Sequence, residues 1–161
     1  MGLPSLLVYP IRVSVRAVIE QSGSVLLVKF DDEHGPHYNW PGGGMDFGES
    51  IHQALMREVW EETNAEIEIG ELVCIYEHLR STEIARTGLP QTISLIFRCS
   101  LCPGTRPCLP EQPDPYEVAV EWISIKDLQD FWILPDITET VQSWSLRTNH
   151  KLPIIVNRED T

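Results

Sequence analysis

Apolar and polar side chains alternate along two early segments of the chain, as they do in half-buried β-strands. In Ile11 to Ile19 every second residue is apolar, and Val25 to Phe30 is again rich in apolar residues. Between them, Gln21 to Ser24 contains the small and polar residues that favour a tight turn. The pattern therefore predicts a β-hairpin near the start of the chain.

The hydrophobic period changes after Ser50, and the new spacing predicts an α-helix from Ile51 to Thr63. Ser50 can cap the first turn, and Gln53 stands at the position that completes a capping box. Asn64 tolerates the left-handed conformation that ends many helices. Both ends of this helix are thus encoded locally.

The rest of the chain is assigned from the same patterns. No periodicity is present from Asp31 to Gly48, which predicts a loop. The other predicted elements are strands at Glu66 to Leu79, Thr92 to Leu101 and Glu117 to Ser124, loops at Arg80 to Gln91 and Pro103 to Pro115, a helical turn at Lys126 to Gln129, and a helix from Asp136 to about Ser145. The length of 161 residues and the absence of a linker or internal repeat predict a single domain over residues 1–161.

The composition is that of a folded protein, and the net charge excludes some classes of binding partner. Hydrophobic residues make up 42% of the chain, and 24 acidic against 12 basic residues give a net charge of −12. Such a charge argues against binding to a nucleic acid polymer or an anionic membrane. The longest early apolar run, Leu6 to Ile11, is interrupted by Pro10, so we expect no membrane span and a cytoplasmic location. If the ligand is an anion, a cation must mediate its binding.

Cys99 and Cys102 have CxxC spacing, which raises a zinc or redox site as an alternative. No second CxxC and no nearby histidine completes a set of four ligands, and Cys99 falls in a predicted strand. A structural role is therefore expected for these cysteines.

Three acidic side chains of the predicted helix share one side. At about 100° per residue, Glu58, Glu61 and Glu62 fall within an arc of about 100° that also contains apolar residues. A solvated acidic face is the alternative, but partial burial of converging carboxylates is costly unless a cation binds them. Oxygen ligands of this kind favour Mg²⁺ or Mn²⁺ over zinc.

Glycines before the helix stand at a fixed distance from these acids. Gly43 is followed after five residues by Glu49, and Glu49 after seven residues by Arg57 and Glu58. With the two later glutamates, this segment resembles the Nudix box, G-x5-E-x7-R-E-U-x-E-E-x-G-U, where U is bulky and aliphatic. Every charged position of that motif is present, and Asn64 and Ala65 replace its last glycine and last aliphatic residue.

The resemblance implies an α/β fold, an α-β-α sandwich with a mixed β-sheet. It also implies an enzyme that hydrolyses a small-molecule nucleoside diphosphate linked to another group, as water attacks a phosphorus of the pyrophosphate. The metal ligands it implies are Glu58, Glu61, Glu62 and the carbonyl of Gly43, and the cofactor is Mg²⁺ or Mn²⁺. Arg57 and Glu49 would pair and brace the loop. Glu61 and Glu62 are the favoured candidates for the general base, and Glu117 is a candidate for an additional ligand. The alternative is a base from a later loop, for which the sequence offers Glu111, Asp114, Glu117 and Glu121.

Substrate recognition is expected from side chains outside the motif. Arginines can bind phosphate and aromatic rings can stack on a base. The candidates are Arg16, Lys29, Tyr38, Trp40 and either Arg80 or Arg86. They do not distinguish a dNTP from ADP-ribose, a nucleotide sugar or a dinucleotide, and a homodimer is left open. The alternative function is a catalytically silent Nudix-fold module that binds a nucleotide or a protein; retention of the four motif glutamates favours the enzyme.

Overall fold

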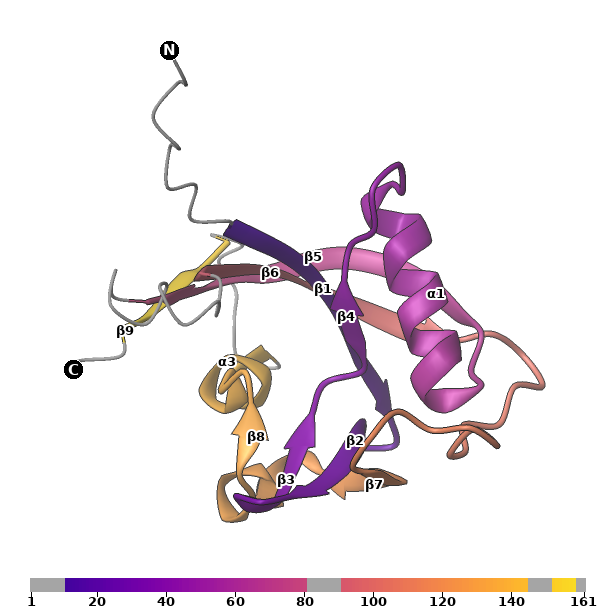
Figure 1. Cartoon of the computed structure of the whole chain (residues 1–161). Helices are drawn as coiled ribbons and strands as arrows, with labels where there is room; N and C mark the ends of the chain where they lie inside the picture. Colours follow the sequence, from indigo (N-terminus) through magenta and orange to yellow (C-terminus); the bar gives the residue numbers. More distant parts are fainter. Residues whose placement is uncertain (1–10, 81–90, 145–151, 159–161) are drawn as a thin grey trace.

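The computed structural model describes residues 11–80, 91–144 and 152–158, and it forms a mixed β-sheet with few helices (Figure 1). The elements are β1 (Ile11–Gln21), β2 (Ser24–Asp32), β3 (Gly35–Asn39), β4 (Gly42–Gly44), α1 (Ile51–Thr63), β5 (Ile67–Leu79), β6 (Gln91–Leu101), β7 (Glu117–Ser124), the 3-10 helix η1 (Ile125–Asp130), β8 (Ile133–Leu134), α3 (Thr138–Gln142) and β9 (Ile154–Arg158). Within these ranges, no helix has the length and apolar character needed to cross a membrane.

The sheet consists of two halves. The first half contains β4, β1, β6, β5 and β9, and the second half contains β7, β2, β3 and β8. They are linked where the last residues of β1 pair with the first residues of β2. Parallel pairs (β1 with β6, β5 with β9, β3 with β8) occur beside antiparallel ones, which confirms the predicted mixed sheet.

Two buried clusters hold the layers together. One packs Leu55 and Val59 of α1 against Val15 and other apolar residues of the first half of the sheet. The other lies on the opposite side of that half and includes Trp40 and the α3 residue Val141. Figure 1 accordingly shows α1 and α3 on different sides of the sheet. The expected layered arrangement is present, although its second helical layer is short.

The ends of α1 match the sequence prediction residue for residue. The Ser50 side chain accepts a hydrogen bond from the Gln53 backbone N–H at 3.2 Å, and the Gln53 side chain accepts one from the Ser50 N–H at 2.9 Å. Asn64 has φ 51°, the left-handed conformation, and its N–H donates to the Trp60 carbonyl. This helix presents the acidic residues of the motif.

Several predicted boundaries are wrong. The predicted loop Asp31 to Gly48 contains β3 and β4, because their short, glycine-containing sequences gain strand structure only by pairing with β2 and β1. The last helix is shorter than expected, spanning Thr138–Gln142, and the predicted end at Ser145 lies outside the described residues. β8 and β9 were not predicted. The loop assigned to Arg80 to Gln91 falls mostly outside the described ranges, as does Arg86.

A bulge changes the direction of one acidic side chain in β7. Lys29 of β2 pairs with Ala119, but the next residue, Phe30, pairs with Glu117 rather than with Val118. Because neighbouring residues of a strand point to opposite faces, Glu117 and Ala119 lie on opposite faces although they are two residues apart. The bulge therefore turns Glu117 away from the face that carries Glu121.

We expect Ser50→Ala to lower the free energy of unfolding by about 1 kcal/mol, because it removes one half of the capping box. Urea denaturation followed by circular dichroism measures this change. Ser100→Ala, at an exposed position of β6, is the matched control and should leave the unfolding midpoint unchanged. Equal stability of Ser50→Ala and the wild type would show that the cap does not support the helix.

Candidate active site

The candidate site lies where α1 meets the short strand β4. The Ala17 N–H donates to the Pro41 carbonyl, and the Met45 N–H donates to the Val13 carbonyl. Because such bonds alternate along an antiparallel pair, the backbone N–H and C=O of Gly43 point towards β1. Polar backbone groups of the neighbouring glycines point towards α1 instead. The Gly42 N–H donates to Glu62 Oε2 at 2.7 Å, and the Gly44 carbonyl accepts from Arg57 Nη2 at 3.1 Å.

Gly43 leaves space for a carboxylate. A Cβ atom at this position would collide with the carboxylate of Glu58. The prediction gave Gly43 a different role, as a carbonyl ligand, but the pairing directs its carbonyl towards Val15. In this structure the backbone groups that face the acidic residues belong to Gly42 and Gly44.

Arg57 binds three glutamates of the motif. Its Nε donates to Glu49 Oε1 at 2.6 Å and its Nη2 to Glu49 Oε2 at 2.9 Å, a bidentate pair. Its Nη1 donates to Glu58 Oε1 at 2.8 Å and to Glu61 Oε2 at 3.0 Å. The hydrogen bond from Arg57 lowers the pKa of Glu49 to about 2. The predicted pairing of Arg57 with Glu49 is thus present, and it ties the loop before α1 to the helix.

Glu62 and Glu117 are buried without comparable compensation. Glu62 is 8% exposed, and burial raises its pKa to about 8, although Arg16 and the Gly42 N–H act in the opposite direction. Glu117 is 6% exposed, and burial is also the main cause of its raised pKa. Its Oε2 accepts from the Asp114 N–H at 3.0 Å, while its Oε1 is buried without a hydrogen-bond partner.

Three carboxylates from two elements therefore face one another. The charges of Glu58 and Glu117 both raise the pKa of Glu62, and Glu58 also raises that of Glu117. The unpartnered Glu117 oxygen and the all-oxygen donor set fit a hard divalent cation. In the described ranges, no three such side chains already stand close enough to hold a metal ion. Like charges and the hydrogen bonds to Arg57 and Gly42 keep them apart.

Glu61 lies further out than the motif suggested. Its side chain is 55% exposed, and Arg57 holds one of its oxygens. Glu117 is the more buried partner of Glu62, although it was predicted only as an additional ligand. The signal that the sequence lacked is the bulge, which no alternation of apolar residues reveals.

The predicted substrate-binding residues are scattered. Trp40 is fully buried and its indole N–H donates to the Pro135 carbonyl at 3.0 Å, so it has no free face on which a base could stack. Lys29 and Tyr38 both contact Glu121, at 3.6 Å and 2.8 Å, on the face of β7 that Glu117 does not share. Arg16 lies beside the acidic residues and donates to the Trp40 carbonyl at 2.8 Å. Arg80 follows β5 at the edge of a described range.

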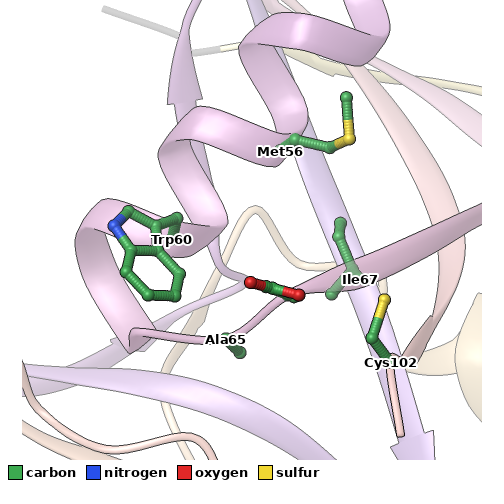
Figure 2. A pocket seen from close by; sticks show the side chains of 6 residues that line it. Met56, Trp60, Ala65, Ile67 and Cys102 are labelled. Carbon is green, nitrogen blue, oxygen red and sulfur yellow. The ribbon is translucent and has the colours of Figure 1, made fainter. Parts of the chain in front are cut away.

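A separate recess of about 410 Å³ lies beside the last turns of α1 and the start of β5 (Figure 2). It is lined by Met56, Trp60, Ala65, Glu66, Ile67 and Cys102. None of the candidate site residues belongs to it. The CxxC residues do not converge there either, because Cys99 lies in the core, where burial raises its pKa to about 12.

Comparison with known proteins agrees with the motif and the fold. A NUDIX domain model matches residues 9–143. A MutT-like protein of Streptomyces ambofaciens is 27% identical over 113 residues, which cover 70% of this chain and 63% of that protein. A putative 8-oxo-dGTP diphosphatase of Bacillus subtilis is 37% identical over 60 residues, 37% of this chain and 39% of that protein. The chain spans less than two thirds of each of these curated relatives.

A solved NUDIX hydrolase from Nitrosomonas europaea is similar in structure, with a TM-score of 0.67 and 26% identity. The similarity covers 85% of this chain and 90% of that protein. It therefore extends well beyond the motif.

The Glu49–Arg57 pair predicts a dependence of stability on acid pH. Since the pKa of Glu49 in the folded state, about 2, lies below the ordinary value of 4.5, the pair stabilises the fold above pH 4.5. This contribution is lost as the pH falls towards 2. We expect the free energy of unfolding to fall less between pH 7 and pH 3 in Glu49→Gln than in the wild type, as measured by urea denaturation. Glu71→Gln, at an exposed position of β5, should behave like the wild type.

Proposed function

The chain belongs to the NUDIX hydrolase family, and from this premise we propose that it is a divalent-cation-dependent pyrophosphohydrolase. Its substrate is proposed to be a nucleoside diphosphate linked to another group, and water is the nucleophile at a phosphorus of the pyrophosphate. We propose further that residues 1–161 act as one domain. The observation that carries the proposal is the buried Glu117 oxygen without a partner beside Glu62 and Glu58.

The chain's own residues supply a site for a cation. Glu58, Glu62 and Glu117 are proposed as its carboxylate ligands, because they converge from α1 and β7 in a partly buried place. A bound Mg²⁺ or Mn²⁺ would neutralise the diphosphate oxygens and lower the pKa of the attacking water. This explains how a chain of net charge −12 can act on an anionic substrate.

Other residues position these ligands. Arg57 holds Glu58 through Nη1 and fixes the preceding loop through Glu49. The Gly42 N–H orients Glu62 by binding one of its oxygens, which leaves the other oxygen for a cation or for water. The general base is proposed to be Glu61 or Glu62. Glu61 reaches solvent, whereas Glu62 is the buried carboxylate, so the two require separate variants.

The relatives support the substrate class and not a single substrate. One relative is a putative 8-oxo-dGTP diphosphatase, and its similarity covers 37% of this chain. The identity of the base and of the leaving group is therefore a question for experiment.

We expect divalent cations to stabilise the protein through these carboxylates. At a Mn²⁺ or Mg²⁺ concentration about a hundred times the dissociation constant, the melting temperature should rise by roughly 5 to 10 °C. Differential scanning fluorimetry measures this shift in the absence of substrate. The shift should be lost in Glu62→Gln and in Glu117→Gln and be retained in Glu68→Gln, an exposed carboxylate of β5. An equal shift in all four proteins would place the cation elsewhere.

We also expect metal-dependent hydrolysis in a screen of dNTPs, 8-oxo-dGTP, ADP-ribose, NADH, nucleotide sugars and dinucleoside polyphosphates. Loss of the general base should lower kcat by roughly 10²- to 10⁴-fold. A loss of this size in Glu61→Gln, with the cation-dependent rise in melting temperature retained, identifies Glu61 as the base. Full activity of Glu61→Gln favours Glu62 instead, whose own variant also loses a proposed cation ligand. Phosphate or nucleotide release by chromatography is the readout, and Glu68→Gln is the control for a lost surface charge.

Two results would contradict this proposal in different ways. Turnover that neither Glu61→Gln nor Glu62→Gln reduces would overturn the site assignment. The absence of metal-dependent turnover across the whole screen would favour a module that binds a nucleotide without hydrolysing it.

A further inference from the structure

Arg12 covers the face of β4 that is opposite the carboxylates. A Cβ atom on Gly44 would lie 2.7 Å from Arg12 Nη2 and 2.9 Å from Arg12 Nε. Because neighbouring residues of a strand point to opposite faces, Gly44 meets Arg12 on one face while Gly43 meets Glu58 on the other. Because β4 has no side chains here, an acidic residue contacts one of its faces and a basic residue contacts the other.

The guanidinium of Arg12 is available for a ligand. Across residues 11–80, 91–144 and 152–158, the structure records no hydrogen bond or ion pair for it, and the residue is exposed. Arg57 and Arg98, in contrast, both bind glutamates. An arginine without a carboxylate partner is notable in a chain with twice as many acidic as basic residues.

Arg16 continues the same basic side towards the acidic residues. Arg12, Ser14 and Arg16 share one face of β1, since alternate residues of a strand do so. The Arg16 Nε is buried without a hydrogen-bond partner, and its Nη1 donates to the Trp40 carbonyl. Burial lowers the pKa of Arg16, while Glu62 and Glu58 act to raise it and Arg12 acts to lower it further, which places Arg16 within reach of both groups.

Between the two arginines this face of the strands is polar. Ser14 Oγ and Ser94 Oγ are 2.7 Å apart, and Thr92 pairs with Arg12 in the neighbouring strand. Because both serines are buried, this polar row links the exposed Arg12 to the partly buried Arg16 beneath the surface. Its chemistry suits a ligand with several anionic oxygens, since a guanidinium binds phosphate through parallel hydrogen bonds.

We propose that Arg12 and Arg16 bind the non-bridging oxygens of the substrate's diphosphate from the side of β4 opposite the carboxylates. Arg12 is the outer, exposed contact and Arg16 the inner one. The inference rests on the proposed function for the identity of the ligand. It adds that the affinity for the diphosphate depends on direct contact with an arginine side chain as well as on the bound metal. Arg12 is accordingly a binding residue, and its loss should affect KM more than kcat.

Binding of a non-hydrolysable probe tests this without turnover. Isothermal titration calorimetry with methylenediphosphonate and Mg²⁺ should show binding to the wild type and roughly 10- to 100-fold weaker binding to Arg12→Gln. Arg12→Lys should recover part of the affinity, because it keeps the charge and loses the paired donors. As Arg12 is exposed, its variants are expected to keep the melting temperature of the wild type.

Arg98→Gln is the matched control. It removes the same charge from the same face of the sheet, six residues along β6 from the partner of Arg12, or about 20 Å away. Its loss should leave probe binding unchanged, which separates a direct contact from a general effect of net charge.

The outcomes separate this inference from the proposed function. Equal probe binding by Arg12→Gln and the wild type, or no binding by the wild type, overturns the role of Arg12, even if the screen finds a hydrolysed nucleotide. Arg12-dependent binding without any hydrolysed substrate supports the role of Arg12 and counts against the enzyme. When a substrate is found, a raised KM with little change in kcat for Arg12→Gln supports the contact, and an unchanged KM contradicts it.

Discussion

The contact between α1 and the edge of β4 is the constraint on which the candidate site depends. An edge strand exposes backbone groups that must find partners, and here the Gly42 N–H and the Gly44 carbonyl find them in Glu62 and Arg57. The helix is thereby positioned by charged side chains of the motif itself. A side chain at Gly43 would keep the helix away, since a Cβ there already overlaps Glu58.

The charges of the site divide into a compensated and an uncompensated set. Arg57 binds Glu49 through two hydrogen bonds and also donates to Glu58 and Glu61, so each of these carboxylates has a partner within the motif. Glu62 and Glu117 are buried and repel each other, and both have raised pKa values. Burying two such groups together is unfavourable for the fold alone. The unfavourable part of the arrangement is thus confined to the place where a cation would bind.

The sequence predicted what is encoded locally and missed what depends on distant partners. The limits of α1 follow from Ser50, Gln53 and Asn64, which act within a few residues, and the structure reproduces them. The three glycines of β4 have no hydrophobic pattern, so only pairing with β1 makes them a strand. The direction of Glu117 depends on a bulge that forms against β2, and alternation alone would have placed it on the face of Glu121.

A strand without side chains also explains how groups of opposite charge can lie so close together. Glu58 and Arg12 approach adjacent glycines from opposite faces, and they are separated by the thickness of one backbone. They do not form an ion pair with each other, because β4 stands between them and Arg57 already binds Glu58. Each group therefore keeps its charge directed outwards from its own face. A phosphate chain that passes one end of β4 would meet a cation bound by the carboxylates on one side and a guanidinium on the other, which is how an acidic protein can bind a polyanion.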